Sequence, residues 1–443
     1  MPVTRITDLS FTGEGVGREG GKVVFLPFTL PGEVVEWERI ETKKTFDRGL
    51  PRRILEPSPL RIRPTCPLFE RCGGCQLQHL DFRTQAEEKE RLFRRLAAHT
   101  LKTEALSFLP PLLSPQGFGY RHRLRLKTAR QGKKVRVGFY HRRSRDLIPL
   151  DHCPLANRAV NAVLPPLQEV LQDLPPESGE PEVELTVADD PASALRGGIL
   201  LELAQKTAHP RLRELTRELN ALPGLAYAFF RVRGSFRLFG ERPFDPERDA
   251  LEYTIAGMRE GASSIRLKVF PSVFSQANLE VNRLLIAELT GLDLFEASSD
   301  LIDLYCGMGN LSLPLSPFFR RVVGLEIFPP AVTNAEWNRK KNRIVNCTFL
   351  EGAAEKTKDL WTSRTSPKWV FLDPPRSGIK GLVSLLNEAR GSIQGVLYLS
   401  CHPLTLLHDL DRLAAFGWKI VWMQMVDFFP QTFHQEWLVH LTP

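Results

Sequence analysis

Short apolar runs alternate with helical patterns over the C-terminal third of the chain, and this alternation restricts the fold more than any other feature of the sequence. Residues 301–305, 321–326, 368–373 and 395–399 are apolar runs, and a helical pattern over 281–289 precedes them. Strands that are separated by helices predict a parallel sheet with helices on both faces. Such a sheet binds ligands at the C-terminal ends of its strands. The polar residues that follow each run are therefore candidates for a functional site.

The turn after the first run is rich in glycine and leads into a helical pattern. Its sequence is Asp303-Leu304-Tyr305-Cys306-Gly307-Met308-Gly309-Asn310. Glycines at such a turn let a cofactor approach the backbone. The second run ends in Glu326, 23 residues after Asp303, where a carboxylate can accept both ribose hydroxyls of a nucleoside cofactor. Because the turn does not follow the G-x-G-x-x-G pattern, an adenosyl cofactor without a pyrophosphate fits better than a dinucleotide.

The third and fourth runs lead to a carboxylate and a thiol. Asp373 ends the third run and is followed by two prolines, while Cys401 follows the fourth run and precedes Pro403, which begins a leucine-rich helical pattern. A thiol at a helix N-terminus is expected to have a lowered pKa, which favours the nucleophilic thiolate. A lone cysteine can instead be a small buried hydrophobe. The position alone leaves both interpretations open.

Two candidates for a general base, His434 and Glu436, precede the apolar run 437–441, which has the pattern of an edge strand. Either residue could remove a proton if that strand returns to the cleft. A polar residue seen in isolation can equally be an ordinary solvated side chain.

Three cysteines, Cys66, Cys72 and Cys75, have the spacing C-x5-C-x2-C, and Cys153 is the candidate for a fourth ligand. Four soft thiolates suit either an iron–sulfur cluster or tetrahedral zinc, and the spacing leaves the two open. Unrelated buried cysteines are a third alternative. The odd total of seven cysteines favours reduced thiols over disulfides. No signal-peptide core and no apolar run near the ~20 residues of a membrane span are present, so we expect a soluble, cytoplasmic protein.

The charge of the chain points to a polyanionic partner. Its 443 residues, enough for two to four domains, contain 59 Lys and Arg against 51 Asp and Glu, a formal charge of +8. Residues 121–145 hold eleven of these cations and no acid. Within them Arg121, Arg123, Arg125 and Lys127 alternate with less polar residues, as in a half-buried strand, and this charged face is the candidate for RNA contact.

The N-terminal part of the chain predicts a barrel and a helix. Short β-like runs and glycine-rich turns between residues 3 and 56 indicate a small oligonucleotide-binding-like barrel. Its cations Lys43, Lys44, Arg48, Arg52 and Arg53 could bind phosphates or form an ordinary solvated face. Residues 84–99 predict a helix that opens with a capping box of Thr84 and Glu87. Residues 155–265 contain no motif that we can assign.

Several motifs, in their order along the chain, resemble those of the RNA uracil-5-methyltransferase family. The motifs are Phe274-Ser275-Gln276-Ala277-Asn278, Tyr305 to Asn310, Asp373-Pro374-Pro375-Arg376, Ser400-Cys401 and Pro430-Gln431-Thr432 through Glu436. The barrel is similar to a TRAM domain, notably at Leu30-Pro31-Gly32-Glu33, and together with the C-x5-C-x2-C group it matches the iron–sulfur branch of that family. Two positions differ from the family pattern: His402 stands where Asn is more frequent, and Gly352-Ala353 lacks a polar side chain after the third strand.

The resemblance implies roles for individual residues. It implies S-adenosylmethionine contacts at Gln276, Tyr305, Asn310, Glu326 and Asp373. It also implies Cys401 as nucleophile, Glu436 as base and a [4Fe-4S] cluster on Cys66, Cys72, Cys75 and Cys153. In the implied reaction the thiolate adds to carbon 6 of a flipped uridine, carbon 5 is methylated, and the base then removes the carbon 5 proton.

The expected fold is a multidomain α/β protein with three parts. These are a TRAM-like barrel over residues 1–58, a central α+β RNA-binding domain with the iron–sulfur site over 59–265, and a Rossmann-like methyltransferase domain over 266–443. We expect a monomer that acts on RNA, with 23S ribosomal RNA favoured and transfer RNA as the alternative. A cytosine-5 methyltransferase would have a further cysteine beside Asp373-Pro374-Pro375, and a non-catalytic RNA-binding scaffold would not need Cys401, Asp373 and Glu436 together.

Overall fold

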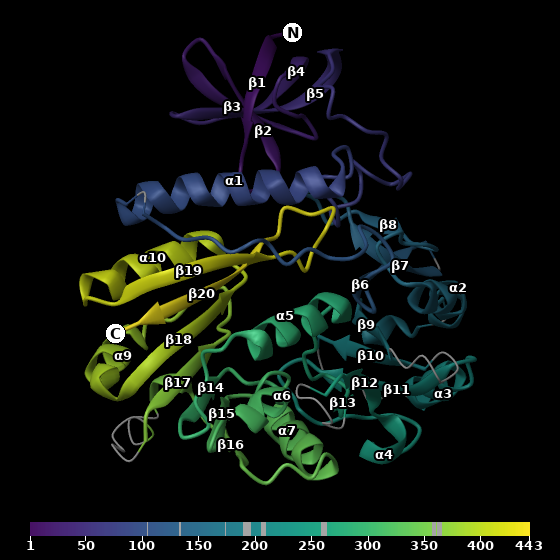
Figure 1. Ribbon diagram of the computed structural model, residues 1–443. Coiled ribbons are helices and arrows are strands. Elements are labelled where there is room, and N and C mark those ends of the chain that lie inside the picture. Colours follow the sequence, from purple (N-terminus) through teal and green to yellow (C-terminus); the bar gives the residue numbers. More distant parts are fainter. Residues whose placement is uncertain are drawn as a thin grey trace.

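The computed structural model describes residues 1–103, 105–132, 134–172, 174–188, 196–204, 210–257, 264–356, 360 and 366–443. The chain begins with a closed five-stranded barrel, drawn in purple at the top of Figure 1. In barrel order its strands are β1 (Val3–Leu9), β2 (Glu14–Glu19), β3 (Lys22–Pro27), β5 (Phe46–Glu56) and β4 (Val34–Thr42). Alternate side chains point inward around the fully buried Trp37, as the period of a half-buried strand requires. The predicted barrel is confirmed.

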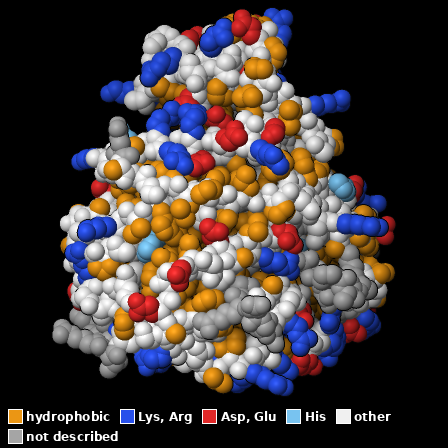
Figure 2. All heavy atoms as spheres, in the orientation of Figure 1, with side chains coloured by type: hydrophobic (Ala, Val, Ile, Leu, Met, Phe, Trp, Pro, Cys, Tyr) orange, Lys and Arg blue, Asp and Glu red, His pale blue; other side chains and the backbone are white. Residues whose placement is uncertain are grey.

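Most of the barrel cations predicted to form a phosphate-binding edge have acidic partners on the barrel itself. Arg52 pairs with Glu38, Arg53 with Glu36, Lys43 with Glu41, and Arg48 with both Glu14 and Glu41. On the face of the molecule seen in Figure 2, blue and red side chains are likewise interspersed. The barrel therefore presents less free positive charge than its sequence suggests.

Helix α1 (Phe82–Leu101) lies between the barrel and the rest of the molecule (Figure 1). The predicted capping box of Thr84 and Glu87 is wrong: Asp81 is the N-cap, and its side chain accepts hydrogen bonds from the backbone N–H groups of Arg83 and Thr84. The helix consequently begins earlier than predicted. Arg91 and Arg95 pair with Asp8 of the barrel, while the opposite face of α1 packs into the core of the C-terminal sheet.

The central part contains a six-stranded sheet. In sheet order its strands are β11 (Leu225–Val232), β10 (Gly197–Leu203), β9 (Glu182–Val187), β6 (Arg123–Gln131), β7 (Lys134–Tyr140) and β8 (Leu147–Pro149). Helices α2 (Arg158–Leu171) and α3 (Pro210–Asn220), with the short η1 (Pro176–Ser178), accompany this sheet. The apolar side chains of α2, including Val160 and Leu167, pack against its core strands. Helix α4 (Pro246–Asp249) and the hairpin β12 (Leu251–Ile255) and β13 (Ile265–Val269) follow.

The basic strand β6 alternates as predicted, with Leu124 and Leu126 buried on the opposite face from the cations. Its cations nevertheless meet acids of the neighbouring strand β9. Arg123 pairs with Glu184, and Arg125 and Lys127 pair with Glu182. Arg142 and Arg143, later in the same basic segment, pair with Glu14 of the barrel, and Lys133 lies outside the described residues. The segment contains no acid in sequence, but the fold supplies several.

The C-terminal part is a seven-stranded sheet. In sheet order its strands are β16 (Cys347–Glu351), β15 (Arg321–Glu326), β14 (Asp300–Leu304), β17 (Lys368–Leu372), β18 (Ile393–Ser400), β20 (Glu436–Thr442) and β19 (Lys419–Val426). The first five strands in this order run parallel, as predicted, and β20 and β19 join antiparallel. The prediction that residues 437–441 form an edge strand is wrong, because β20 lies between β18 and β19.

Helices and apolar cores cover both faces of this sheet. The helical elements are α5 (Leu279–Gly291), α6 (Ser312–Leu315), η2 (Ser316–Phe318), α7 (Pro329–Lys341), η3 (Ala354–Lys356), α9 (Val383–Ala389), η4 (Arg390–Ser392) and α10 (Pro403–Ala415). Two separate clusters of buried side chains contain strand residues of the sheet, as helices on both faces require. The α/β fold and the terminal barrel are both confirmed. Among the described residues, no helix is long and apolar enough to cross a membrane.

Candidate active site

Three neighbouring parallel strands end at the same edge of the C-terminal sheet and place three predicted residues there. Tyr305 follows β14, Asp373 follows β17 and Cys401 follows β18. The order β15-β14-β17 also contains the point where the chain reverses its progression across the sheet, because β15 and β17 lie on opposite sides of β14. Ligands bind parallel sheets at this kind of point. The predicted edge of the sheet is therefore the right one.

A pocket at this edge is lined by four of the five predicted cofactor contacts. Gln276, Tyr305, Asn310 and Asp373 all contribute to its wall, together with Asp303. The turn from β14 into the pocket bends sharply, with positive φ at Tyr305 (64°), Gly307 (56°) and Gly309 (83°). A Cβ at position 309 would also come within 3.0 Å of side-chain atoms of Leu313 and Phe349. Glycine is thus required there for the turn to pass close to the neighbouring core.

The side chain of Asn310 is engaged inside the protein. Its amide nitrogen donates to Asn282 Oδ1 at 2.8 Å, and its oxygen accepts from Asn282 Nδ2 at 2.9 Å and from the Tyr253 hydroxyl at 2.8 Å. This reciprocal pair joins the glycine turn to α5 and β12. Neither partner was predicted from the sequence, since neither belongs to a motif. Asn310 lines the pocket while its amide mainly fixes the turn.

Glu326, the fifth predicted contact, stands beside the pocket at the end of β15. Its Oε2 accepts from the Gly307 N–H at 3.1 Å and its Oε1 accepts from the Phe328 N–H at 2.9 Å. Each carboxylate oxygen can accept more than one hydrogen bond, so these backbone contacts orient the group and leave lone pairs for a ligand.

The pocket is strongly acidic. Burial, followed by repulsion from Asp303 and Glu326, raises the pKa of Asp373 to about 7. Burial also raises the pKa of Asp303 to about 7, against the effect of the hydrogen bond from the Ser312 hydroxyl. Three carboxylates that repel one another in a confined space are relieved by a positively charged ligand. A cationic adenosyl compound, such as a sulfonium, satisfies this requirement.

Cys401 and Glu436 lie next to each other at the side of this pocket. Ser400 of β18 pairs with Trp437 of β20 in antiparallel register, so the residue after Ser400 and the residue before Trp437 are neighbours across the strand pair. Burial raises the pKa of the Cys401 thiol above 9.0, and the carboxylates of Glu436 and Asp373 raise it further, while Arg376 acts in the opposite direction. The prediction of a lowered thiol pKa is therefore wrong for the ligand-free protein.

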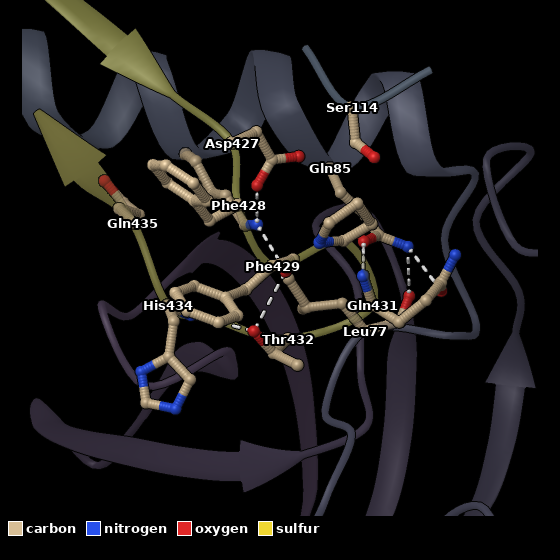
Figure 3. A network of polar contacts seen from close by, with 12 residues as sticks. Leu77, Gln85, Ser114, Asp427, Phe428, Phe429, Gln431, Thr432, His434 and Gln435 are labelled. Carbon is tan, nitrogen blue, oxygen red and sulfur yellow. Dashed lines mark hydrogen bonds and ion pairs between the residues drawn. The ribbon is translucent and has the colours of Figure 1, made fainter. Parts of the chain in front are cut away.

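Glu436 has the properties of an unused base. Its side chain is buried, and burial together with Asp373 raises its pKa well above the usual range. Within the described part of the chain, its carboxylate has no hydrogen-bond or ion-pair partner. His434, the other candidate base, has its pKa lowered to about 4 by burial and by nearby cations, and its side chain points away from the surrounding polar network in Figure 3. The geometry favours Glu436.

His402, which departs from the family pattern, caps α10. Its Nδ1 accepts a hydrogen bond from the Thr405 N–H at 3.3 Å and lies 2.7 Å from the Thr405 hydroxyl. Asparagine is also a favoured N-cap residue, so His402 performs the capping task that an asparagine side chain could perform. Cys306, in the glycine turn, is buried, and burial raises its pKa well above the ordinary range.

The four predicted cluster ligands Cys66, Cys72, Cys75 and Cys153 line one cavity. Apart from these thiols, Gln78 and Arg121, its wall is apolar. No three His, Cys, Asp or Glu side chains in the described ranges are close enough to hold a single metal ion, so the sulfurs surround a space rather than converge on a point. All four donors are thiols, and none of the cavity-lining residues is a carboxylate or an imidazole. Such a donor set fits a group with several iron atoms.

Arg121 belongs to this cavity rather than to the exposed basic face. Its Nε is buried without a hydrogen-bond partner, and its guanidinium lies 5.4 Å from the centre of the Phe429 ring. The prediction that Arg121 joins Arg123 and Arg125 in RNA contact is wrong, because Arg121 precedes the first residue of β6 and turns inward. A cation at this place would offset the negative charge of several thiolates.

The sheet order and the acidic pocket at its C-terminal edge define an enzyme of the Rossmann-like methyltransferase class. The pattern of the tRNA (Uracil-5-)-methyltransferase family matches residues 252–443, and that of the TRAM domain matches residues 4–46. The chain is 34% identical over 440 residues to the 23S rRNA (uracil(1939)-C(5))-methyltransferase RlmD of Edwardsiella ictaluri, covering 98% of this chain and 94% of that one. An uncharacterised RNA methyltransferase of Thermosynechococcus vestitus is 30% identical over 452 residues, covering 99% and 97%.

A solved structure shares the whole architecture. The tRNA (uracil-54, C5)-methyltransferase of Pyrococcus abyssi, in complex with S-adenosyl-L-homocysteine, superimposes with a TM-score of 0.72 over 99% of both chains at 21% identity. The chain belongs to the RNA uracil-5-methyltransferase family with a TRAM domain. It is an RNA (uracil-5-)-methyltransferase that depends on S-adenosylmethionine.

Proposed function

We propose that this enzyme methylates carbon 5 of one uridine in 23S ribosomal RNA through a covalent bond between Cys401 and carbon 6 of the base. The observation that supports this most directly is the juxtaposition of Cys401 and Glu436 beside the acidic pocket. The curated relatives at 34% identity are named as enzymes of 23S ribosomal RNA. The structural neighbour named for transfer RNA has 21% identity, so transfer RNA is the second candidate substrate.

The residues of the chain perform distinct steps. Gln276, Tyr305, Asn310, Glu326 and Asp373 hold S-adenosylmethionine, which supplies the methyl group when bound. The Cys401 thiolate adds to carbon 6, and the electron pair of the double bond moves to carbon 5 and its carbonyl, which makes carbon 5 nucleophilic. After carbon 5 has gained the methyl group, Glu436 removes its proton. The double bond then re-forms and the Cys401 thiolate leaves.

The cysteine cavity supports a second part of the proposal. Cys66, Cys72, Cys75 and Cys153 would hold a [4Fe-4S] cluster, because four thiols surround a largely apolar space instead of one tetrahedral point. A single zinc ion would need the four sulfurs at about 2.3 Å from one centre. The cavity is far from such convergence.

Mapping of 5-methyluridine in cellular RNA tests the substrate assignment. RNA from cells with and without this gene is digested and the modified positions are located by primer extension and mass spectrometry. We expect one 5-methyluridine in 23S ribosomal RNA to disappear without the gene and to return with the wild-type gene but not with Cys401→Ala. Loss of a transfer-RNA position alone would assign the enzyme to the second candidate substrate.

A further inference from the structure

The loop of residues 427–435, which connects β19 to β20 and leads directly into Glu436, is anchored at its start by α1. Lys89 Nζ pairs with Asp427 Oδ1 at 2.9 Å and donates to the Phe429 carbonyl at 3.2 Å. Both charged residues are almost completely buried, with 2% and 1% of their surfaces exposed. Figure 1 shows this yellow segment extending beneath α1, toward the part of the chain that carries the cysteines.

One helical turn before Lys89, Gln85 anchors the middle of the same loop. Its side-chain nitrogen donates to Gln431 Oε1 at 2.9 Å, and its side-chain oxygen accepts from the Gln431 N–H at 2.8 Å (Figure 3). The carbonyl of Gln431 accepts from the N–H groups of Gln76 and Leu77, both at 3.1 Å. Gln431 has a φ of 70°, a left-handed conformation that costs a non-glycine residue about 1 kcal/mol and needs support from its surroundings.

The end of the loop is also held by α1. Phe93 stacks on Trp437, the residue after Glu436, with ring centres 3.7 Å apart and planes inclined by 15°. Gln85, Lys89 and Phe93 follow one another at intervals of four residues and so lie on one face of the helix. This face contacts the start, the middle and the end of the loop. The neighbours of Glu436 are thereby fixed on both sides in sequence.

A buried ion pair adds little to the free energy of unfolding, because desolvation of both charges offsets their attraction. Its use lies in selecting one geometry among several. We propose that Gln85 and Lys89 are positioning residues for RNA methylation, which hold loop 427–435 in the one conformation that places Glu436 opposite Cys401. The inference rests on the proposed role of Glu436 as the base.

The same contacts connect the base to the cysteine-bearing segment. Gln85 also donates to the carbonyls of Leu77 and Leu80, which follow Cys75 closely in sequence. A displacement of residues 76–80 would therefore be transmitted to Gln431 and from there to Glu436. This gives the cysteine site a structural route to the catalytic step.

The first test uses Lys89→Met and Gln85→Met, with Arg91→Met as the matched control. Arg91 is on the same helix but pairs with Asp8 of the barrel. With target RNA and labelled S-adenosylmethionine, proton removal should slow roughly tenfold to a hundredfold in the first two variants, because misplacement of a catalytic group by about 1 Å has such an effect. A methylated covalent adduct should accumulate on a denaturing gel, as in Glu436→Gln. Arg91→Met should resemble the wild type.

A double variant, Lys89→Met with Asp427→Leu, guards against simple unfolding, because it leaves no unpaired buried charge. It should still accumulate adduct. Normal turnover by this folded double variant would overturn the proposal, as would adduct levels in Lys89→Met equal to those in Arg91→Met.

A second readout does not depend on catalysis. The rate of Cys401 alkylation is followed against pH by mass spectrometry of the Cys401 peptide, without RNA. Glu436, Asp373 and Arg376 are the charged groups that act on this thiol. If Lys89→Met displaces Glu436, the alkylation midpoint should fall toward that of Glu436→Gln. An unchanged midpoint would overturn the proposal, whereas failure of Glu436→Gln itself to accumulate adduct would refute the role of Glu436 as base and leave the positioning result to the alkylation midpoint.

Discussion

Cys401 illustrates how a residue's chemistry depends on neighbours that its own sequence surroundings do not contain. Its position before α10 predicts a lowered thiol pKa from the helix dipole. The structure places it beside Glu436 and Asp373, from two other strands, and burial and these carboxylates dominate. The free enzyme therefore keeps Cys401 largely as a neutral thiol at neutral pH. A cationic cofactor in the acidic pocket would partly cancel the repulsion that opposes thiolate formation.

The pH dependence of Cys401 reactivity tests this charge balance. Because the thiol pKa is raised above 9.0, alkylation of Cys401 in the free enzyme should rise about tenfold per pH unit up to a midpoint above pH 9. Asp373→Asn removes one repelling carboxylate, so its midpoint should lie at a lower pH. Asp300→Asn, at the opposite end of β14, serves as the control and should not move it. A higher midpoint in Asp373→Asn would contradict the assignment.

At the scale of the single element, β6 shows why a cluster of cations in sequence is a poor measure of free charge. Arg123, Arg125 and Lys127 pair with Glu182 and Glu184, which lie about sixty residues further along the chain and reach them only through the register of β9 against β6. The alternation of the strand was predictable from its period of two. Its acidic neighbours were not, because local sequence does not specify the order of strands in the sheet.

The unpaired cations of the basic segment should contribute more to RNA affinity than the paired ones. Lys134, Arg136 and Arg145 have no acidic partner among the described residues. Replacing these three by alanine should reduce the slope of log K against log salt concentration by about 0.7 to 0.9 for each RNA phosphate that is no longer neutralised. Replacement of Arg123, Arg125 and Lys127 should change the slope less. Filter binding over a range of salt concentrations measures both slopes, and the reverse order would contradict the expected roles.

The elements of the active site were predictable to different degrees. Strand ends with Tyr305, Asp373 and Cys401 followed from hydrophobic periodicity and from the rule for ligand sites in parallel sheets. The pairing of β20 with β18 did not, since a strand preceded by a long loop can join the sheet at several places. Gln85 and Lys89 were also missed, because polar residues on a helix normally face solvent. Their spacing of four residues on the buried stripe with Phe93 was the available signal.

At the scale of the whole molecule, α1 and loop 427–435 join parts that the sequence separates. The predicted domain boundary at residue 265 remains a prediction, yet α1, on the N-terminal side of it, packs into the core of the C-terminal sheet. The arrangement follows from buried polar contacts between residues far apart in sequence, such as Lys89 with Asp427. Local patterns predict the parts of this protein better than their assembly.

The cysteine cavity links two distant segments and yields a prediction for the complete protein. Anaerobically purified enzyme should be brown and contain about four iron atoms per chain, since the cavity is enclosed by four thiols. Cys153→Ser removes the ligand that is farthest in sequence and should lower the iron content, whereas Cys347→Ser, a buried cysteine of β16, should not. Colourless protein with one equivalent of zinc would contradict the assignment.

The central claim is that Cys401 forms the covalent bond and Glu436 ends it. Wild-type, Glu436→Gln and Cys401→Ala proteins are incubated with target RNA and labelled S-adenosylmethionine and separated on a denaturing gel. Glu436→Gln should accumulate a methylated enzyme–RNA adduct, because the carbon 5 proton is not removed. Cys401→Ala should form neither adduct nor product while still binding the cofactor. Normal turnover by Glu436→Gln, or adduct formation by Cys401→Ala, would contradict the account.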